Sequence, residues 1–145
     1  MKSILVLAAV LAVFLQTALA SIYSQLQFMK IESPKDGQDI RAGDYLTVKY
    51  VMQPLIKNQV SMGKALSLDI NFHSRKGNKK QQQLGAIHKS CPVEARDDKY
   101  VTYTKKWRIP ENTKPGSYAV DFVERVQFRR TQITSTETVK INVVD

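Results

Sequence analysis

The sequence predicts an all-β fold, a two-layer antiparallel sandwich of about seven strands. Apolar and polar residues alternate in the segments 45–52 and 66–73, which is typical of strands with one buried and one solvated face. Residues that favour turns separate these runs at short intervals. Beyond the first twenty residues, no segment has a convincing helical period.

The N-terminus has the pattern of a cleaved secretory signal. Lys2 precedes an unbroken apolar run over residues 4–15, and residues 18–20 form a small-x-small cleavage sequence. The run is shorter than the about 20 apolar residues of a membrane-spanning helix, so no transmembrane segment is expected. We expect a signal peptide over residues 1–20 and one folded domain over residues 21–145, secreted to the extracellular space or the cell wall.

The chain is basic and has one cysteine. Without the signal it carries 21 basic and 13 acidic residues, a net charge of +8. This excess favours an anionic partner such as an acidic polysaccharide. The alternative is that the charge only keeps the protein soluble. No nucleic-acid partner is expected. We expect Cys91 to be a buried thiol, with an intermolecular disulfide as the alternative. The oligomeric state stays open.

The individual strands follow from local patterns. Residues 33–37 and 41–44 are predicted turns, because Pro presets a turn and Gly accepts a positive φ. Residues 45–52 form the first clear strand, and residues 53–63 leave room for a short helical turn at most, because Pro54 and Gly63 bound it closely. The next strand, 66–73, has Leu66, Leu68, Ile70 and Phe72 inward and Ser67, Asp69, Asn71 and His73 in solvent.

The second half of the chain continues in the same way. Gly77-Asn78 is a predicted hairpin turn, and Lys114-Pro115-Gly116 separates two later strands. The remaining expected strands are 84–88, 100–109, 118–128 and 131–144. In the strand 100–109, the alternation places Trp107 in the core rather than on the surface, where it would stack on sugar rings.

Two segments carry a resemblance to a known family. Residues 31–50, with their Ser-Pro-x-x-Gly turn, Ala-Gly step and Leu-Thr-Val-x-Tyr strand, resemble the opening of the Ig-like N-terminal domain of fungal cell-wall β-1,6-glucan synthesis proteins and their Ser/Thr-rich anchored relatives. Residues 109–118, which contain Pro-Gly-Ser-Tyr, are similar to the approach to that domain's penultimate strand.

The resemblance implies an Ig-like (fibronectin III-like) sandwich at a cell wall, with no catalytic residues to carry over. Tyr118 suits a tyrosine corner, in which the phenol caps backbone at the edge of such a sandwich. Those wall proteins usually carry a long Ser/Thr-rich region, which this sequence lacks. A soluble wall component and a secreted protein that acts on another organism therefore both stay open.

No motif predicts an enzyme or a metal site. A copper oxygenase would need histidine at its mature N-terminus, where Ser21 is expected, and both histidines precede Cys91, which excludes a cupredoxin pattern. Ser90 and Cys91 have no accompanying nucleophile motif. The three acids that remain for sugar hydrolysis are assigned to solvated strand faces; they are Asp69, Asp121 and Glu124. We predict a non-enzymatic protein without metal or cofactor.

Basic residues provide the predicted binding sites. The segment from Ile70 to Val93 holds no acid, and four cations lie within six residues of it at the tip of a hairpin. This basic hairpin comprises Arg75, Lys76, Lys79 and Lys80, with Lys89 following. It suits an anionic polymer, whereas the alternatives are a solvated tip that discourages aggregation and a nuclear-targeting run. A second predicted patch comprises Lys105, Lys106, Arg108, Arg129 and Arg130.

These observations lead to one hypothesis and one competitor. The leading hypothesis is a secreted, non-enzymatic module that binds cell-wall or other anionic polysaccharide through the basic hairpin and flanking strand faces. The competitor is a secreted effector or signalling protein that engages a host protein or an anionic surface with the same residues.

Overall fold

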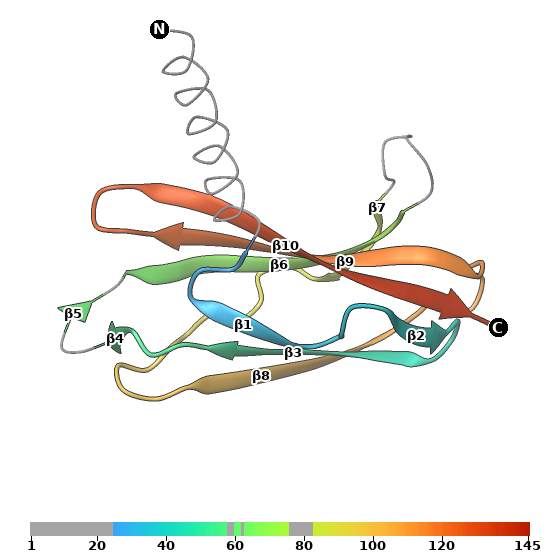
Figure 1. The fold of residues 1–145 in the computed structure, drawn as a ribbon, viewed down its shortest axis with the longest axis horizontal. Coiled ribbons are helices and arrows are strands. Elements are labelled where there is room, and N and C mark those ends of the chain that lie inside the picture. The colour runs from blue at the N-terminus through green and yellow to red at the C-terminus, as the bar shows by residue number, and fades with distance from the viewer. Residues whose placement is uncertain (1–24, 58–59, 62, 76–82) are drawn as a thin grey trace, which may run out of the picture.

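The structure, a computed structural model, is all-β. It describes residues 25–57, 60–61, 63–75 and 83–145, and these ranges contain strands and no helix (Figure 1). No helix in these ranges could therefore cross a membrane. The strands are β1 (Met29–Ser33), β2 (Gln38–Arg41), β3 (Tyr45–Met52), β4 (Ile56–Lys57), β5 (Val60–Ser61), β6 (Lys64–Ser74), β7 (Gln83–His88), β8 (Val101–Arg108), β9 (Gly116–Gln127) and β10 (Gln132–Val144).

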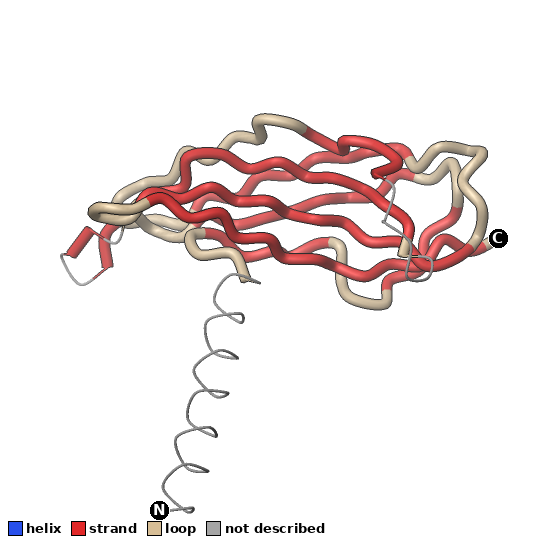
Figure 2. Tube along the Cα trace, turned by 90° about the horizontal axis from the view of Figure 1, so that it is seen from above, coloured by secondary structure: helices blue, strands red, loops and turns tan. Residues whose placement is uncertain are grey.

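Two sheets face one another and form the layers of a sandwich. The smaller sheet has the order β1-β3-β8 and the larger one the order β2-β10-β9-β6-β7, while β4 and β5 form a separate short pair. The strands run along the long axis of the molecule, and loops gather at its two ends (Figure 2). The predicted two-layer all-β fold is thus confirmed, with eight strands in the two main sheets.

One pairing departs from the predicted antiparallel arrangement. β2 runs parallel to β10, with Ile40 opposite Val143. The turn after β1 explains this, because it carries the chain from the smaller sheet to the larger one without reversing its direction. Gly37 has a φ of 80° in that turn, and its N–H donates to the carbonyl of Lys140 at 2.8 Å.

The core lies between the two sheets. The alternating residues of β3 are buried, as predicted, and so are those of the closing strand β10. The largest fully buried side chains include Tyr50, Phe72, Phe122, Leu46, Met52, Leu68, Ile70 and Ile141. Trp107 packs against this core from β8, with its ring centroid 5.1 Å from that of Phe72, so the prediction that it faces inward is confirmed.

Two local predictions were wrong. Leu66 is only half-buried, because a bulge between Ala65 and Ser67 moves the inward position to Ala65. The short helical turn considered for residues 53–63 is not found in the described part of that range, where residues 56–57 and 60–61 form the pair β4–β5. The backbone N–H groups of Leu55 and Ile56 donate to the carbonyls of residues 96 and 97, which favours the extended form.

Tyr118 occupies the predicted tyrosine corner. Its phenol donates a hydrogen bond to the carbonyl of Lys114, four residues earlier, at 2.6 Å. Its ring stacks on Phe72 with the centroids 5.1 Å apart. This corner fixes the start of β9, which carries one half of the candidate site.

Candidate functional site

The structure describes two of the five residues assigned to the basic hairpin. Lys76, Lys79, Lys80 and the predicted turn Gly77-Asn78 lie outside the described residues. Arg75 directly follows β6, where the hairpin begins. Lys89 follows the other end of β7, because His88 pairs with Ile70. Arg75 is five residues further along the chain than Ile70, a distance of roughly 16 Å in an extended strand, so Lys89 does not belong to the hairpin tip.

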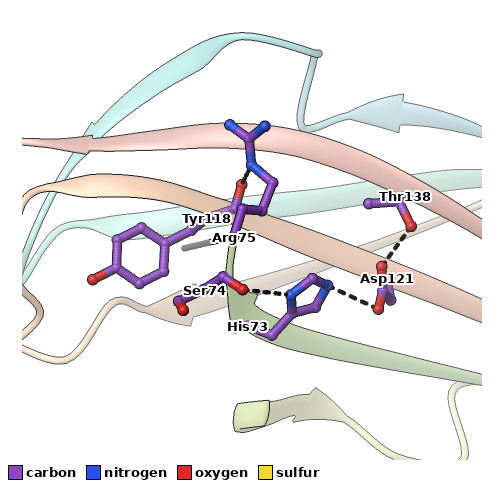
Figure 3. A network of polar contacts seen from close by, with 6 residues as sticks. All are labelled: His73, Ser74, Arg75, Tyr118, Asp121 and Thr138. Carbon is purple, nitrogen blue, oxygen red and sulfur yellow. Dashed lines mark hydrogen bonds and ion pairs between the residues drawn. The ribbon is translucent and has the colours of Figure 1, made fainter. Parts of the chain in front are cut away.

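Two hydrogen bonds anchor Arg75 to the neighbouring strand β9. Its backbone N–H donates to the carbonyl of Ser117 at 2.9 Å, and its side-chain Nε donates to the carbonyl of Tyr118 at 2.7 Å. The two terminal guanidinium nitrogens point away from these contacts (Figure 3). The guanidinium is therefore held in one orientation, with the part that forms paired bonds to carboxylate or phosphate directed outward.

A polar network lies beside Arg75 on the outer face of the larger sheet. His73 Nε2 is 2.9 Å from Asp121 Oδ2, and Thr138 donates to Asp121 Oδ1 at 2.6 Å (Figure 3). His73 Nδ1 lies 3.1 Å from the carbonyl oxygen of Ser74. Three adjacent strands, β6, β9 and β10, thus contribute to one network.

His73 was predicted in solvent, but it is only 6% exposed. Each of its ring nitrogens lies within hydrogen-bond distance of an oxygen, one of the Asp121 carboxylate and the other of the Ser74 carbonyl. The ring donates to both acceptors only when both nitrogens carry a proton. Thr138 contacts Asp121 rather than the imidazole. The network fixes the surface next to Arg75.

Glu124 was also predicted in solvent, and it is fully buried on the inner face of β9. Its carboxylate accepts the backbone N–H of Gln27 at 2.6 Å and that of Phe28 at 3.1 Å, and Glu137 accepts the N–H of Leu26 at 3.2 Å. Burial raises the pKa of Glu124, while the two backbone hydrogen bonds oppose this shift. The carboxylates thus hold the segment that leads into β1.

The long connection between β7 and β8 contains Cys91, which is buried as predicted. Its Sγ lies 3.5 Å from the carbonyl of His88, and burial raises its pKa to about 11. Tyr50 donates to the carbonyl of Pro92 at 2.6 Å, which pins the same loop to the core. Within the described ranges, no three metal-binding side chains gather.

The five residues of the second predicted patch do not lie together. Lys105 is opposite Val48, whereas Lys106 is opposite Thr47, so the two lysines point to different sides of β8. Arg108 lies opposite Tyr45 at one end of the sheet. Arg129 and Arg130 lie between β9 and β10, at the other end of the sandwich (left in Figure 1).

Local alternation in the sequence could not predict the His73–Asp121 pair or the buried contacts of Glu124. The pairing of His73 with Asp121 depends on the register between β6 and β9, which are distant in sequence. The one available signal for Glu124 was its phase, since it continues the inward series of Val120 and Phe122. Its charge favoured the solvated face, and the backbone donors that satisfy it come from residues 27 and 28.

Comparisons with known proteins do not assign this chain to a family. No known protein family matches the chain, and no curated protein resembles it significantly in sequence. Among solved structures, it is similar to a family 123 glycoside hydrolase from Clostridium perfringens (18% identity, 75% of this chain and 22% of that one, TM-score 0.49). It is also similar to the sporulation control protein Spo0M from Bacillus subtilis (10%, 83% and 51%, TM-score 0.48) and to a superoxide reductase from Ignicoccus hospitalis (14%, 79% and 80%, TM-score 0.41). The chain spans 22% and 51% of the first two proteins, and at these scores none of the three bears on its function.

Proposed function

We propose that this protein is a secreted, non-enzymatic Ig-like domain that binds an anionic polysaccharide of the cell wall or extracellular space. The observation that carries the proposal is the anchored guanidinium of Arg75. Its Nε and backbone N–H are bound to β9, and Lys76, Lys79 and Lys80 follow it closely in sequence. A cation held in one orientation loses little conformational freedom when it binds a carboxylate or phosphate group.

The strand order supports the Ig-like part of the proposal. Named in chain order, the smaller sheet corresponds to strands A, B and E, and the larger one to strands G, F, C and C′ with an added edge strand. The tyrosine corner at Tyr118 is a second feature of that fold. The signal-like N-terminus and the resemblance of residues 31–50 to fungal wall domains support secretion and a wall location.

A sedimentation experiment tests the proposal. The purified domain is mixed with insoluble β-glucan, chitin, mannan and an acidic wall fraction, and pelleting is measured at low and high salt. We expect pelleting with the acidic fraction that high salt abolishes, because ion pairs with the polymer are screened. A variant with Arg75, Lys76, Lys79 and Lys80 changed to Ser should bind about tenfold more weakly.

A charge-matched variant provides the control. Changing Lys89, Lys105, Arg129 and Arg130 to Ser also removes four positive charges, but from exposed positions outside the hairpin. This control should keep most of the affinity. Equal losses in the two variants would show that only net charge matters, and no pelleting with any polymer would favour the competing role of a secreted effector that binds a host protein.

A further inference from the structure

The outer face of the smaller sheet is mostly polar, and its side chains are exposed or half-exposed. The register between β3 and β8 sets three pairs side by side, namely Tyr45 with Arg108, Thr47 with Lys106, and Lys49 with Thr104. Successive residues on one face of a strand are about 7 Å apart, and neighbouring strands about 4.8 Å apart. The six side chains therefore form a continuous surface on the side of the molecule opposite the His73 network.

This surface carries an excess of positive charge. Lys30 of β1 lies opposite Val51, so it joins Lys49, Lys106 and Arg108 on the same face. Lys49 forms an ion pair with Glu32 at 3.0 Å, and Arg108 forms one with Glu111. Within the described ranges, neither Lys30 nor Lys106 forms an ion pair, which leaves two cations available to a ligand.

Tyr45 is the largest apolar group on this surface. It is 64% exposed, although the aromatic residues of the same sheet that face inward are buried or half-buried. The neighbouring Arg108 is held by a bond from its Nε to the carbonyl of Gly43 at 2.9 Å. An exposed ring beside fixed polar groups offers a stacking surface for the apolar face of a sugar.

We propose that this face, defined by Lys30, Tyr45, Thr47, Lys49, Thr104, Lys106 and Arg108, is a second binding surface for an extended anionic polysaccharide. Tyr45 stacks on a sugar ring, Lys106 and Lys30 pair with carboxylate groups, and the two threonines hydrogen-bond to hydroxyl groups. The ligand class rests on the proposed function, whereas the surface is independent of Arg75.

The composition of the face favours a sugar polymer, which is less densely charged than a nucleic acid. Nucleic-acid surfaces neutralise a phosphate backbone that carries one charge per about 1.7 Å of duplex, which needs many closely spaced cations. Among the described residues of this face, only Lys30 and Lys106 are cations without an acidic partner, and Lys106 has Thr47 opposite it on β3 and Thr104 two residues before it on β8. Hydroxyl groups at this spacing suit the many donors and acceptors of a sugar chain.

Two matched pairs of variants test this surface. Tyr45→Ala is compared with Tyr100→Ala, because Tyr100 is 71% exposed and precedes β8 at the opposite end of the sheet. Lys106→Ser is compared with Lys105→Ser, because these adjacent exposed lysines lie on different sides of β8. Binding to soluble polygalacturonate is measured by calorimetry, in the natural sequence and in the fourfold hairpin variant.

We expect Tyr45→Ala to weaken binding about tenfold and Lys106→Ser about threefold in both backgrounds, with Tyr100→Ala and Lys105→Ser almost unchanged. Equal effects within either matched pair would overturn the proposal. So would tighter binding to a single-stranded oligonucleotide that depends on Tyr45. If the natural sequence binds no polysaccharide, the proposed function fails as well; if it binds and Tyr45→Ala has no effect, only this second surface fails.

Discussion

The outer faces of the two sheets differ in whether their polar side chains bond to one another or remain exposed. On the larger sheet, His73, Asp121 and Thr138 satisfy one another, and His73 is buried although it lies on an outer face. On the smaller sheet, Lys106 and Tyr45 are exposed, and no ion pair engages Lys106 within the described residues. Polar groups that satisfy one another contribute to stability, whereas those left exposed contribute little to it and are available for binding.

On the inner face of the larger sheet, the buried polar group Glu124 is paired with backbone donors, and its loss should have the largest effect on the free energy of unfolding. Glu124→Ala should lower the free energy of unfolding by about 3 kcal/mol, because the N–H groups of Gln27 and Phe28 lose their acceptor in the core. Urea denaturation measures the change. Glu137→Ala is the control, with an expected loss of about 1 kcal/mol, because Glu137 is half-buried and accepts one N–H. Equal losses would contradict this account of the inner face.

The outer network of the larger sheet should respond less, because it is closer to solvent. Asp121→Ala removes the partner of both His73 and Thr138, and we expect a loss of about 2 kcal/mol. Thr138→Ala removes one exposed donor and should cost less than about 1 kcal/mol. Denaturation curves that leave Asp121→Ala within error of the natural sequence would remove the distinction between the two outer faces.

The pH dependence of the free energy of unfolding tests the buried Glu124 in a second way. The expected effect is smaller than that of Glu124→Ala, because a change of pH leaves the carboxyl group in place. Burial raises the pKa of Glu124 in the folded protein above its value in the unfolded chain. Its protonated form is therefore favoured by folding. The resulting stability is fully present below the unfolded-state pKa of about 4.3 and is lost as the pH rises through the higher folded-state value.

The Glu124→Gln variant isolates that contribution. The free energy of unfolding of the natural sequence minus that of Glu124→Gln should decrease as the pH is raised from 4 to neutrality. The reason is that Glu124 can lose its proton over this range, whereas the glutamine of the variant does not titrate. Chemical denaturation at several pH values measures it. A difference that stays constant over this range would show that Glu124 is charged to the same degree in both states.

The sequence allowed the strands to be predicted far better than their partners. The expected strand 45–52 coincides with β3, and the expected strands 100–109 and 131–144 contain β8 and β10. Local alternation is sufficient for this, because each inward residue reports its own burial. Register, bulges and the passage of the chain between sheets depend on residues far apart in sequence. The pairing of His73 with Asp121 therefore became evident only in the structure, whereas the separation of Lys105 from Lys106 across β8 follows from the alternation of the predicted strand 100–109.

The exposed ion pair of the smaller sheet gives the smallest expected effect and completes the contrast. Lys49 and Glu32 are 43% and 44% exposed and lie 3.0 Å apart, so solvent screens their attraction. A double-mutant cycle with Lys49→Ala and Glu32→Ala should give a coupling energy below about 0.5 kcal/mol. The same cycle with His73→Ala and Asp121→Ala should give at least about 1 kcal/mol, because that histidine is buried. Similar coupling energies in the two cycles would mean that burial on the outer face of the larger sheet does not strengthen its polar contacts.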